Sequence, residues 1–106
     1  MPAYLVVRAV VADPADRVDF DDWYRTEHLP DALRAFAARS AWRGWSRSEP
    51  AVHCACYRFG SLAAAEAATG GEAIKALIAE FDRRWGSRVT RTREIFRVID
   101  ELEATP

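Results

Sequence analysis

The chain has 106 residues, half of them hydrophobic, and a net charge of −1 at pH 7. This length fits a single domain covering residues 1–106, and the basic residues are scattered among acidic ones, which argues against a nucleic-acid partner. No run approaches the ~18 apolar residues that span a bilayer, and no export signal opens the chain, so we expect a cytoplasmic protein without a membrane partner.

The first third of the chain predicts one strand and two helical pieces. Residues 3–12 are rich in valine and largely apolar on both parities, which is typical of a central strand covered on both sides. A stripe of apolar residues at helical spacing follows. Pro30 lacks an N–H and disfavours helical geometry at the residue before it. We therefore expect the helix to end or kink around His28, with one piece over about 15–28 and a second over about 30–39.

The rest of the chain predicts three more strands and two helices. Residues 41–48 alternate in polarity as an edge strand does, and residues 52–59 form a second central strand. Ser61 is a suitable N-cap for an alanine-rich helix over 62–68. A glycine pair separates this helix from a longer one over 72–85, and the last strand covers 89–102.

This order of elements predicts a fold. Two β-α-β halves joined by a short turn give an α+β, ferredoxin-like βαββαβ sandwich with a four-stranded antiparallel sheet. Right-handed crossovers place the helices on one face. The other face would still carry apolar side chains, so we expect a homodimer in which a second copy covers it. The candidates for this face are Val6, Val10, Cys54, Cys56, Phe96 and Val98.

The segment around His28 is the best candidate for a functional site. A helix ending near His28 would place its imidazole one turn from Tyr24 and beside Glu27. We expect the helix end and the neighbouring carboxylates to favour the charged imidazolium. His28 is then either an acid/base group or a residue that caps the broken helix through backbone carbonyls.

The motif Phe20-x-x-Trp23-Tyr24-x-x-Glu27-His28-Leu29-Pro30 and the order of elements resemble the dimeric α+β barrel superfamily, most closely its EthD-like branch. The resemblance implies two sheets paired into a barrel and a pocket between each sheet and its helices. Members include monooxygenases that use no cofactor, polyketide cyclases, isomerases, haem-degrading enzymes and proteins without known activity. The carry-over of function is limited to His28 and, less directly, to Trp23 and Tyr24.

Further side chains are candidates for binding a small-molecule ligand. Trp23 could line an apolar pocket, although packing against the sheet is the commoner role of such a residue. His53 and Tyr57 share one face of the strand over 52–59, and both could meet His28 if that face turns toward the helices. The predicted site is therefore His28 and Tyr24 as catalytic residues, with Trp23, Glu27, His53 and Tyr57 binding the ligand.

We expect no cofactor and no metal, because no nucleotide-binding loop or metal-binding motif is present. Three functions remain open. The first is a cofactor-independent enzyme of monooxygenase or cyclase type, acting on an aromatic or apolar ligand. The second is a non-catalytic binding or accessory protein, and the third is a haem-binding relative, because a lone histidine can be an axial ligand.

Overall fold

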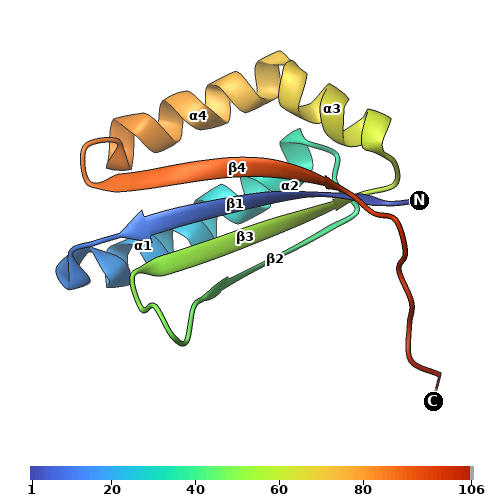
Figure 1. Cartoon of the computed structure of the whole chain (residues 1–106). Helices are drawn as coiled ribbons and strands as arrows, with labels where there is room; N and C mark the ends of the chain where they lie inside the picture. Colours follow the sequence, from blue (N-terminus) through green and yellow to red (C-terminus); the bar gives the residue numbers. More distant parts are fainter. Residues whose placement is uncertain (106) are drawn as a thin grey trace.

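The computed structural model describes residues 1–105 and contains one four-stranded antiparallel sheet (Figure 1). The sheet order is β2-β3-β1-β4, which puts β1 and β3 in the centre and β2 and β4 at the edges, as the sequence predicts. This is the predicted ferredoxin-like α+β fold. The strands are β1 (Ala3–Val11), β2 (Ser40–Trp45), β3 (Val52–Phe59) and β4 (Val89–Arg97).

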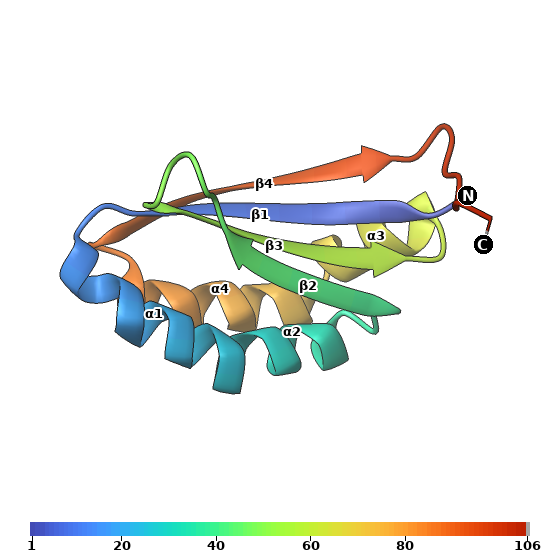
Figure 2. The same ribbon diagram turned by 90° about the horizontal axis from the view of Figure 1, so that it is seen from below.

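All the helices pack on one face of this sheet (Figure 2). A 3-10 turn (Pro14–Asp16) leads into α1, and Ser61 caps α3 by accepting a hydrogen bond from the Ala64 N–H at 3.1 Å, as expected. The helical crossovers join parallel strands that flank a third strand, β1 to β2 across β3 and β3 to β4 across β1, and their right-handedness explains the one-sided arrangement. The helices are α1 (Arg17–Trp23), α2 (Leu29–Ala35), α3 (Leu62–Gly70) and α4 (Glu72–Trp85), and a π-helical turn, η2 (Tyr24–His28), joins α1 to α2.

The core lies between the sheet and the helices and is dominated by aromatic rings. Leu5 of β1 pairs with Tyr57 of β3 and with Ile95 of β4, so this parity of the three strands faces the helices. Phe20 of α1 is fully buried and lies 5.3 Å from Trp85 and 6.1 Å from Phe81, measured between ring centroids. Edge-on ring pairs of this kind add stability beyond the area they bury.

The opposite face of the sheet carries no helix and forms what we call the open face. Its central pairs are Val6 with Cys56 and Arg8 with Cys54. Two large apolar side chains lie on it, Trp42 of β2 at 57% exposure and Phe96 of β4 at 48%. An uncovered face with apolar groups of this size is unusual in a monomer.

Two details of the sequence prediction are wrong. The last strand ends at Arg97 rather than near residue 102, because the chain turns back and Glu101 binds Arg58 at 3.0 Å and also accepts a hydrogen bond from the Tyr4 hydroxyl. The predicted break at Pro30 is absent. The backbone stays helical through His28 and Leu29, with φ and ψ of −70° and −47° at His28 and −64° and −47° at Leu29.

Candidate functional site

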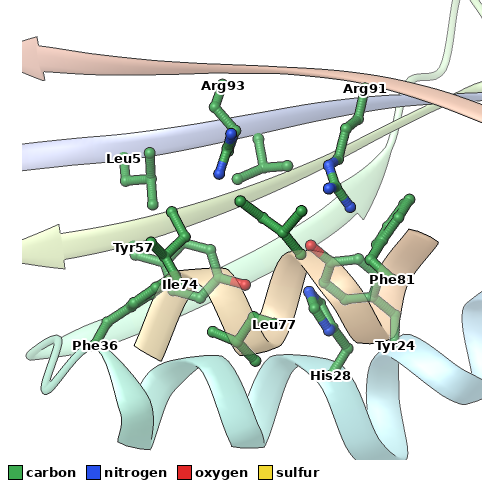
Figure 3. A pocket seen from close by; sticks show the side chains of 12 residues that line it. Leu5, Tyr24, His28, Phe36, Tyr57, Ile74, Leu77, Phe81, Arg91 and Arg93 are labelled. Carbon is green, nitrogen blue, oxygen red and sulfur yellow. The ribbon is translucent and has the colours of Figure 1, made fainter. Parts of the chain in front are cut away.

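A pocket opens between the sheet and the helices beneath His28 (Figure 3). Its polar lining residues are Tyr24, His28, Tyr57, Arg91 and Arg93. The apolar ones are Leu5, Val7, Phe36, Ile74, Leu77, Ile78 and Phe81. The cavity volume is about 30 Å³. This is far below the roughly 300–1,000 Å³ that ligand pockets usually measure. A ligand must therefore push lining side chains aside as it enters.

The π-helical turn delivers His28 to this pocket. The Leu29 N–H bonds to the Tyr24 carbonyl, five residues back, rather than to the carbonyl four residues back. This wider turn relieves the clash that the ring of Pro30 would otherwise make with the preceding turn. Isolated π turns inside α-helices occur frequently at functional sites. Here the extra residue rotates Tyr24 and His28 to the buried side of the helix.

His28 is buried among aromatic rings and is only 8% exposed. Its imidazole stacks on Trp23 with a centroid distance of 4.6 Å and an interplanar angle of 21°. Burial, and then the positive charge of Arg91, lower the pKa of His28 to about 4, although Asp31 opposes the shift. The expected imidazolium is therefore wrong: the helix does not end at His28, and loss of hydration outweighs the nearby carboxylate.

The Nδ1 atom of His28 makes no hydrogen bond within residues 1–105. Within the described residues, Nδ1 of His28 thus does not cap the helix by bonding to a backbone carbonyl. A buried polar atom without a partner is costly and calls for an explanation in function or in a bound molecule.

Tyr24 and Tyr57 place two phenol groups in the same pocket (Figure 3). Burial raises the pKa of Tyr24 to about 12, and it raises the pKa of Tyr57 further above its usual value. Both hydroxyls therefore stay protonated at neutral pH and can donate hydrogen bonds. The Tyr24 ring also lies between two imidazoles, 4.8 Å from His28 and 4.5 Å from His53.

The other predicted site residues lie outside the pocket. Trp23 supports His28 from behind, and Glu27 is exposed on the helix surface. His53 is fully buried behind Tyr24, where its Nε2 lies 3.3 Å from Nη1 of Arg43. Burial and the charge of Arg43 lower the pKa of His53 to about 4. The structure thus brings His28, Tyr24 and Tyr57 together, but not His53.

His53 belongs instead to a separate polar group near the start of β3. Arg43 and the Trp45 indole both donate to Oδ1 of Asp21, each at 2.8 Å. These hydrogen bonds hold the pKa of Asp21 below its usual value. The group ties α1 to the edge strand β2, so we assign it a structural role rather than a place in the pocket.

Sequence reasoning missed Arg91 and Arg93, the two cations of the pocket. Both lie on the parity of β4 that faces the helices, because Arg91 pairs with Ala9 and Arg93 with Val7. A signal was present in the sequence. Arg91 and Arg93 share the parity of the apolar residues Val89 and Ile95, so two arginines interrupt the face of this strand that is otherwise apolar. Arg91 is partly buried there and so requires a partner or a role, whereas Arg93 is exposed at the edge of the pocket.

Comparisons with solved structures place this architecture among known folds. An EthD family protein from Bacillus halodurans C-125 is 17% identical, covers 93% of this chain and 100% of its own, and superposes with a TM-score of 0.69. SnoaB, a cofactor-independent oxygenase from Streptomyces nogalater solved as the mutant N63A, is 12% identical with coverage of 97% and 98% and a TM-score of 0.71.

A putative antibiotic biosynthesis monooxygenase from Nitrosomonas europaea is 12% identical, with coverage of 92% and 90% and a TM-score of 0.65. No family sequence model matches the chain, and no curated protein sequence matches it. The class is therefore defined by architecture: the chain shares its ferredoxin-like α+β fold with these proteins. The predicted resemblance to the dimeric α+β barrel superfamily is confirmed at the level of the fold, with an EthD family protein among the structures that share it.

None of the helices within residues 1–105 is long and apolar enough to cross a membrane. In the same part of the chain, no three or more His, Cys, Asp or Glu side chains are grouped so as to hold a metal ion.

Proposed function

We propose that this chain is a small-molecule enzyme that performs acid/base chemistry without a cofactor on an aromatic or apolar ligand, with His28 as the acid/base group. The observation that carries the proposal is the state of His28. It is a buried, neutral imidazole that lines an apolar pocket and has an Nδ1 atom without a partner. Only a neutral imidazole can accept a proton.

The first step would be removal of a proton from the ligand. His28 takes the proton and becomes an imidazolium, and the ligand keeps the electron pair as an anion. The Tyr24 hydroxyl, which stays protonated, donates a hydrogen bond to the oxygen that carries the negative charge. In a cyclase reaction, this carbanion attacks a carbonyl carbon of the same ligand, the π electrons of that carbonyl move to its oxygen, and the alkoxide takes the proton back from His28. In a monooxygenase reaction, the anion is the reductant and molecular oxygen the oxidant: the carbon forms a hydroperoxide that takes the proton from His28, and loss of water leaves one oxygen atom on the ligand as a carbonyl.

The shared fold is compatible with both the cyclase and the monooxygenase version of the reaction and does not distinguish between them. SnoaB is described as a cofactor-independent oxygenase, and the protein from Nitrosomonas europaea as a putative monooxygenase. A shared fold carries many unrelated chemistries, so the proposal depends on the residues of this pocket.

The test follows hydrogen–deuterium exchange at C1 of 2-tetralone, an aromatic ketone whose C1–H is acidic. We expect the protein to accelerate the exchange, measured by NMR in D₂O, and His28→Gln to lose the acceleration by about a hundredfold or more. The matched control is His53→Gln, which removes the other buried neutral histidine but leaves the pocket lining intact. Equal exchange rates for His28→Gln and the unmodified protein would contradict the proposal. Oxygen consumption in the same samples separates oxygenase from cyclase chemistry.

A second candidate is a non-catalytic binding protein, and the low pKa of His28 favours it. An imidazole whose pKa is about 4 is a weak base at neutral pH. This candidate predicts that 2-tetralone raises the melting temperature of the protein without any acceleration of the exchange at C1.

We also propose that the partner of this chain is a second copy of itself, bound to the open face. Trp42 on the edge strand β2 and Phe96 on the edge strand β4 would be covered in the contact between the two sheets, and large aromatic side chains contribute strongly to such contacts. The two paired sheets would form the barrel of the superfamily that this chain resembles.

A further inference from the structure

Arg91 is a partly buried cation at the pocket with few partners. Its side chain is 14% exposed, and its single ion pair within residues 1–105 joins Nη2 to Oδ1 of Asp82 at 3.3 Å. A guanidinium carries five N–H donors. Most of the donors of Arg91 thus have no protein acceptor in the described chain, although burial has removed part of their hydration.

The guanidinium of Arg91 is held in a fixed position. Its Cζ atom lies 4.0 Å from the centroid of the Phe81 ring, close enough for a cation–π contact. Phe81 also lines the pocket and lies 5.8 Å from the ring of His28. One face of the guanidinium therefore rests on an aromatic ring, and Figure 3 shows the side chain extending from β4 toward Tyr24 and Phe81.

Arg93 adds a second positive charge two residues along the same strand. Alternate residues of a strand share one face at about 6.5–7 Å. Within residues 1–105, Arg93 makes no ion pair. Arg91 has Asp82 as its partner, but the side chain of Asp82 is 59% exposed, so water screens its negative charge. Arg93 also lines an adjoining groove that shares Leu5 and Ile74 with the pocket. A second cation therefore lies at the edge of the pocket beside Arg91, while Glu94 lines the adjoining groove.

We propose that the ligand of this pocket carries an acidic oxygen, as a carboxylate, enolate or phenolate on an aromatic or apolar body, and that Arg91 binds this oxygen while Arg93 assists at the entrance. This inference rests on the proposed function and names the chemistry of its ligand. The apolar lining holds the body of the ligand, and the planar guanidinium suits two oxygens or one delocalised oxyanion.

The same arrangement resolves a difficulty in the proposed mechanism. A base with a pKa of about 4 removes a proton only when the anion left behind is stabilised close by. A guanidinium that cannot lose its charge at neutral pH supplies this stabilisation. His28 and Arg91 thus have complementary tasks: one holds the proton, and the other holds the negative charge on oxygen.

The test compares two probes of nearly equal shape, 2-naphthoate and 2-naphthamide, by isothermal titration calorimetry at neutral pH. We expect the unmodified protein to bind the carboxylate at least tenfold more tightly than the neutral amide. Arg91→Gln should abolish this preference: the affinity for 2-naphthoate should fall about tenfold or more, and the affinity for 2-naphthamide should change by no more than about twofold. Arg93→Gln should lower the affinity for 2-naphthoate about three- to fivefold. Arg91→Lys should keep part of the preference.

Arg97→Gln is the matched control, because Arg97 lies on the same face of β4 beyond the pocket. Its carboxylate affinity should not change. Circular dichroism melting curves verify that each variant is folded. Equal affinity of the unmodified protein for both probes would overturn this inference and leave the proposed function standing. Equal loss of both probes in Arg91→Gln would also overturn it, because Arg91 would then only shape the pocket. Failure of both probes to bind would overturn it together with the ligand pocket.

Discussion

The two faces of the sheet use aromatic residues in different ways. On the helix-covered face, Phe20, Trp85 and Tyr24 are buried in one packed cluster, with Phe20 edge-on to Trp85 and tilted against Tyr24. On the open face, Trp42 and Phe96 are about half exposed, and no helix of the described residues covers them. The first arrangement stabilises the monomer and frames a pocket. The second contributes little to the monomer and is the surface to which we propose that a second copy binds.

The largest effect that separates the two faces should come from Phe20→Ala. Phe20 is fully buried and contacts rings from α1, α4, β2 and β3. We expect the free energy of unfolding to fall by about 3–5 kcal/mol, because the substitution leaves a cavity that the neighbouring rings fill only partly. Urea unfolding followed by far-ultraviolet circular dichroism measures the change. A loss below about 1 kcal/mol would mean that the cluster is loosely packed.

The covered face should also make stability depend on pH. The folded pKa of about 4 for His28 and His53 lies below the ordinary value of 6.5, so the unfolded chain binds protons that the folded chain does not. The stabilisation is complete above about pH 6.5 and is lost as the pH falls toward 4. Each histidine accounts for roughly 3 kcal/mol over this window, at 1.36 kcal/mol for each pKa unit.

His53→Gln isolates this effect from the titration of carboxylates. The difference in unfolding free energy between the unmodified protein and this variant should shrink by roughly 3 kcal/mol between pH 7 and pH 4. His28→Gln should behave in the same way. Urea unfolding at a series of pH values measures both. A difference that does not vary with pH would show that the buried histidines already titrate normally.

The smallest effect on monomer stability, but the largest on association, should come from Trp42→Glu. A carboxylate on the open face would be buried without a partner in a dimer, and losing a large aromatic contact of an interface typically costs about 2 kcal/mol or more where the side chain is a main anchor. We expect the proposed dimer to dissociate at least about thirtyfold more readily in sedimentation equilibrium. Val18→Glu is the matched control, because Val18 is exposed on α1, on the helical side of the molecule. A dimer of the unmodified protein that persists in Trp42→Glu would contradict the proposal that the open face is the interface.

Much of the fold could be predicted from the sequence because its signals are local. The strand over Val52–Phe59 and the helix over Glu72–Trp85 were predicted with the bounds that the structure has. Ser61 was recognised as a cap because a hydroxyl before an alanine-rich run satisfies a free N–H. The parity of Tyr57 and His53 followed from strand alternation alone. At Pro30 the local rule failed, because a π turn accommodated the proline without ending the helix.

The candidate site was less predictable, because it depends on packing between distant elements. His28, Tyr24 and Tyr57 were singled out from the sequence and do line one pocket, whereas Trp23, Glu27 and His53 were also singled out and do not. Whether a side chain on the correct parity reaches the pocket depends on its position along the strand and on what stands in front of it. Tyr24 stands in front of His53.

The sequence by itself determined the order of strands and helices, the side of each strand that is apolar, and the presence of an imidazole before a proline in an aromatic helix. These follow from periodicity and from the geometry of single residues. Only the tertiary structure decided that His28 is neutral and that Arg91 and Arg93 face it from the other edge of the sheet. Charge states and pockets depend on how much water the assembled elements exclude, and no local stretch of sequence contains that quantity.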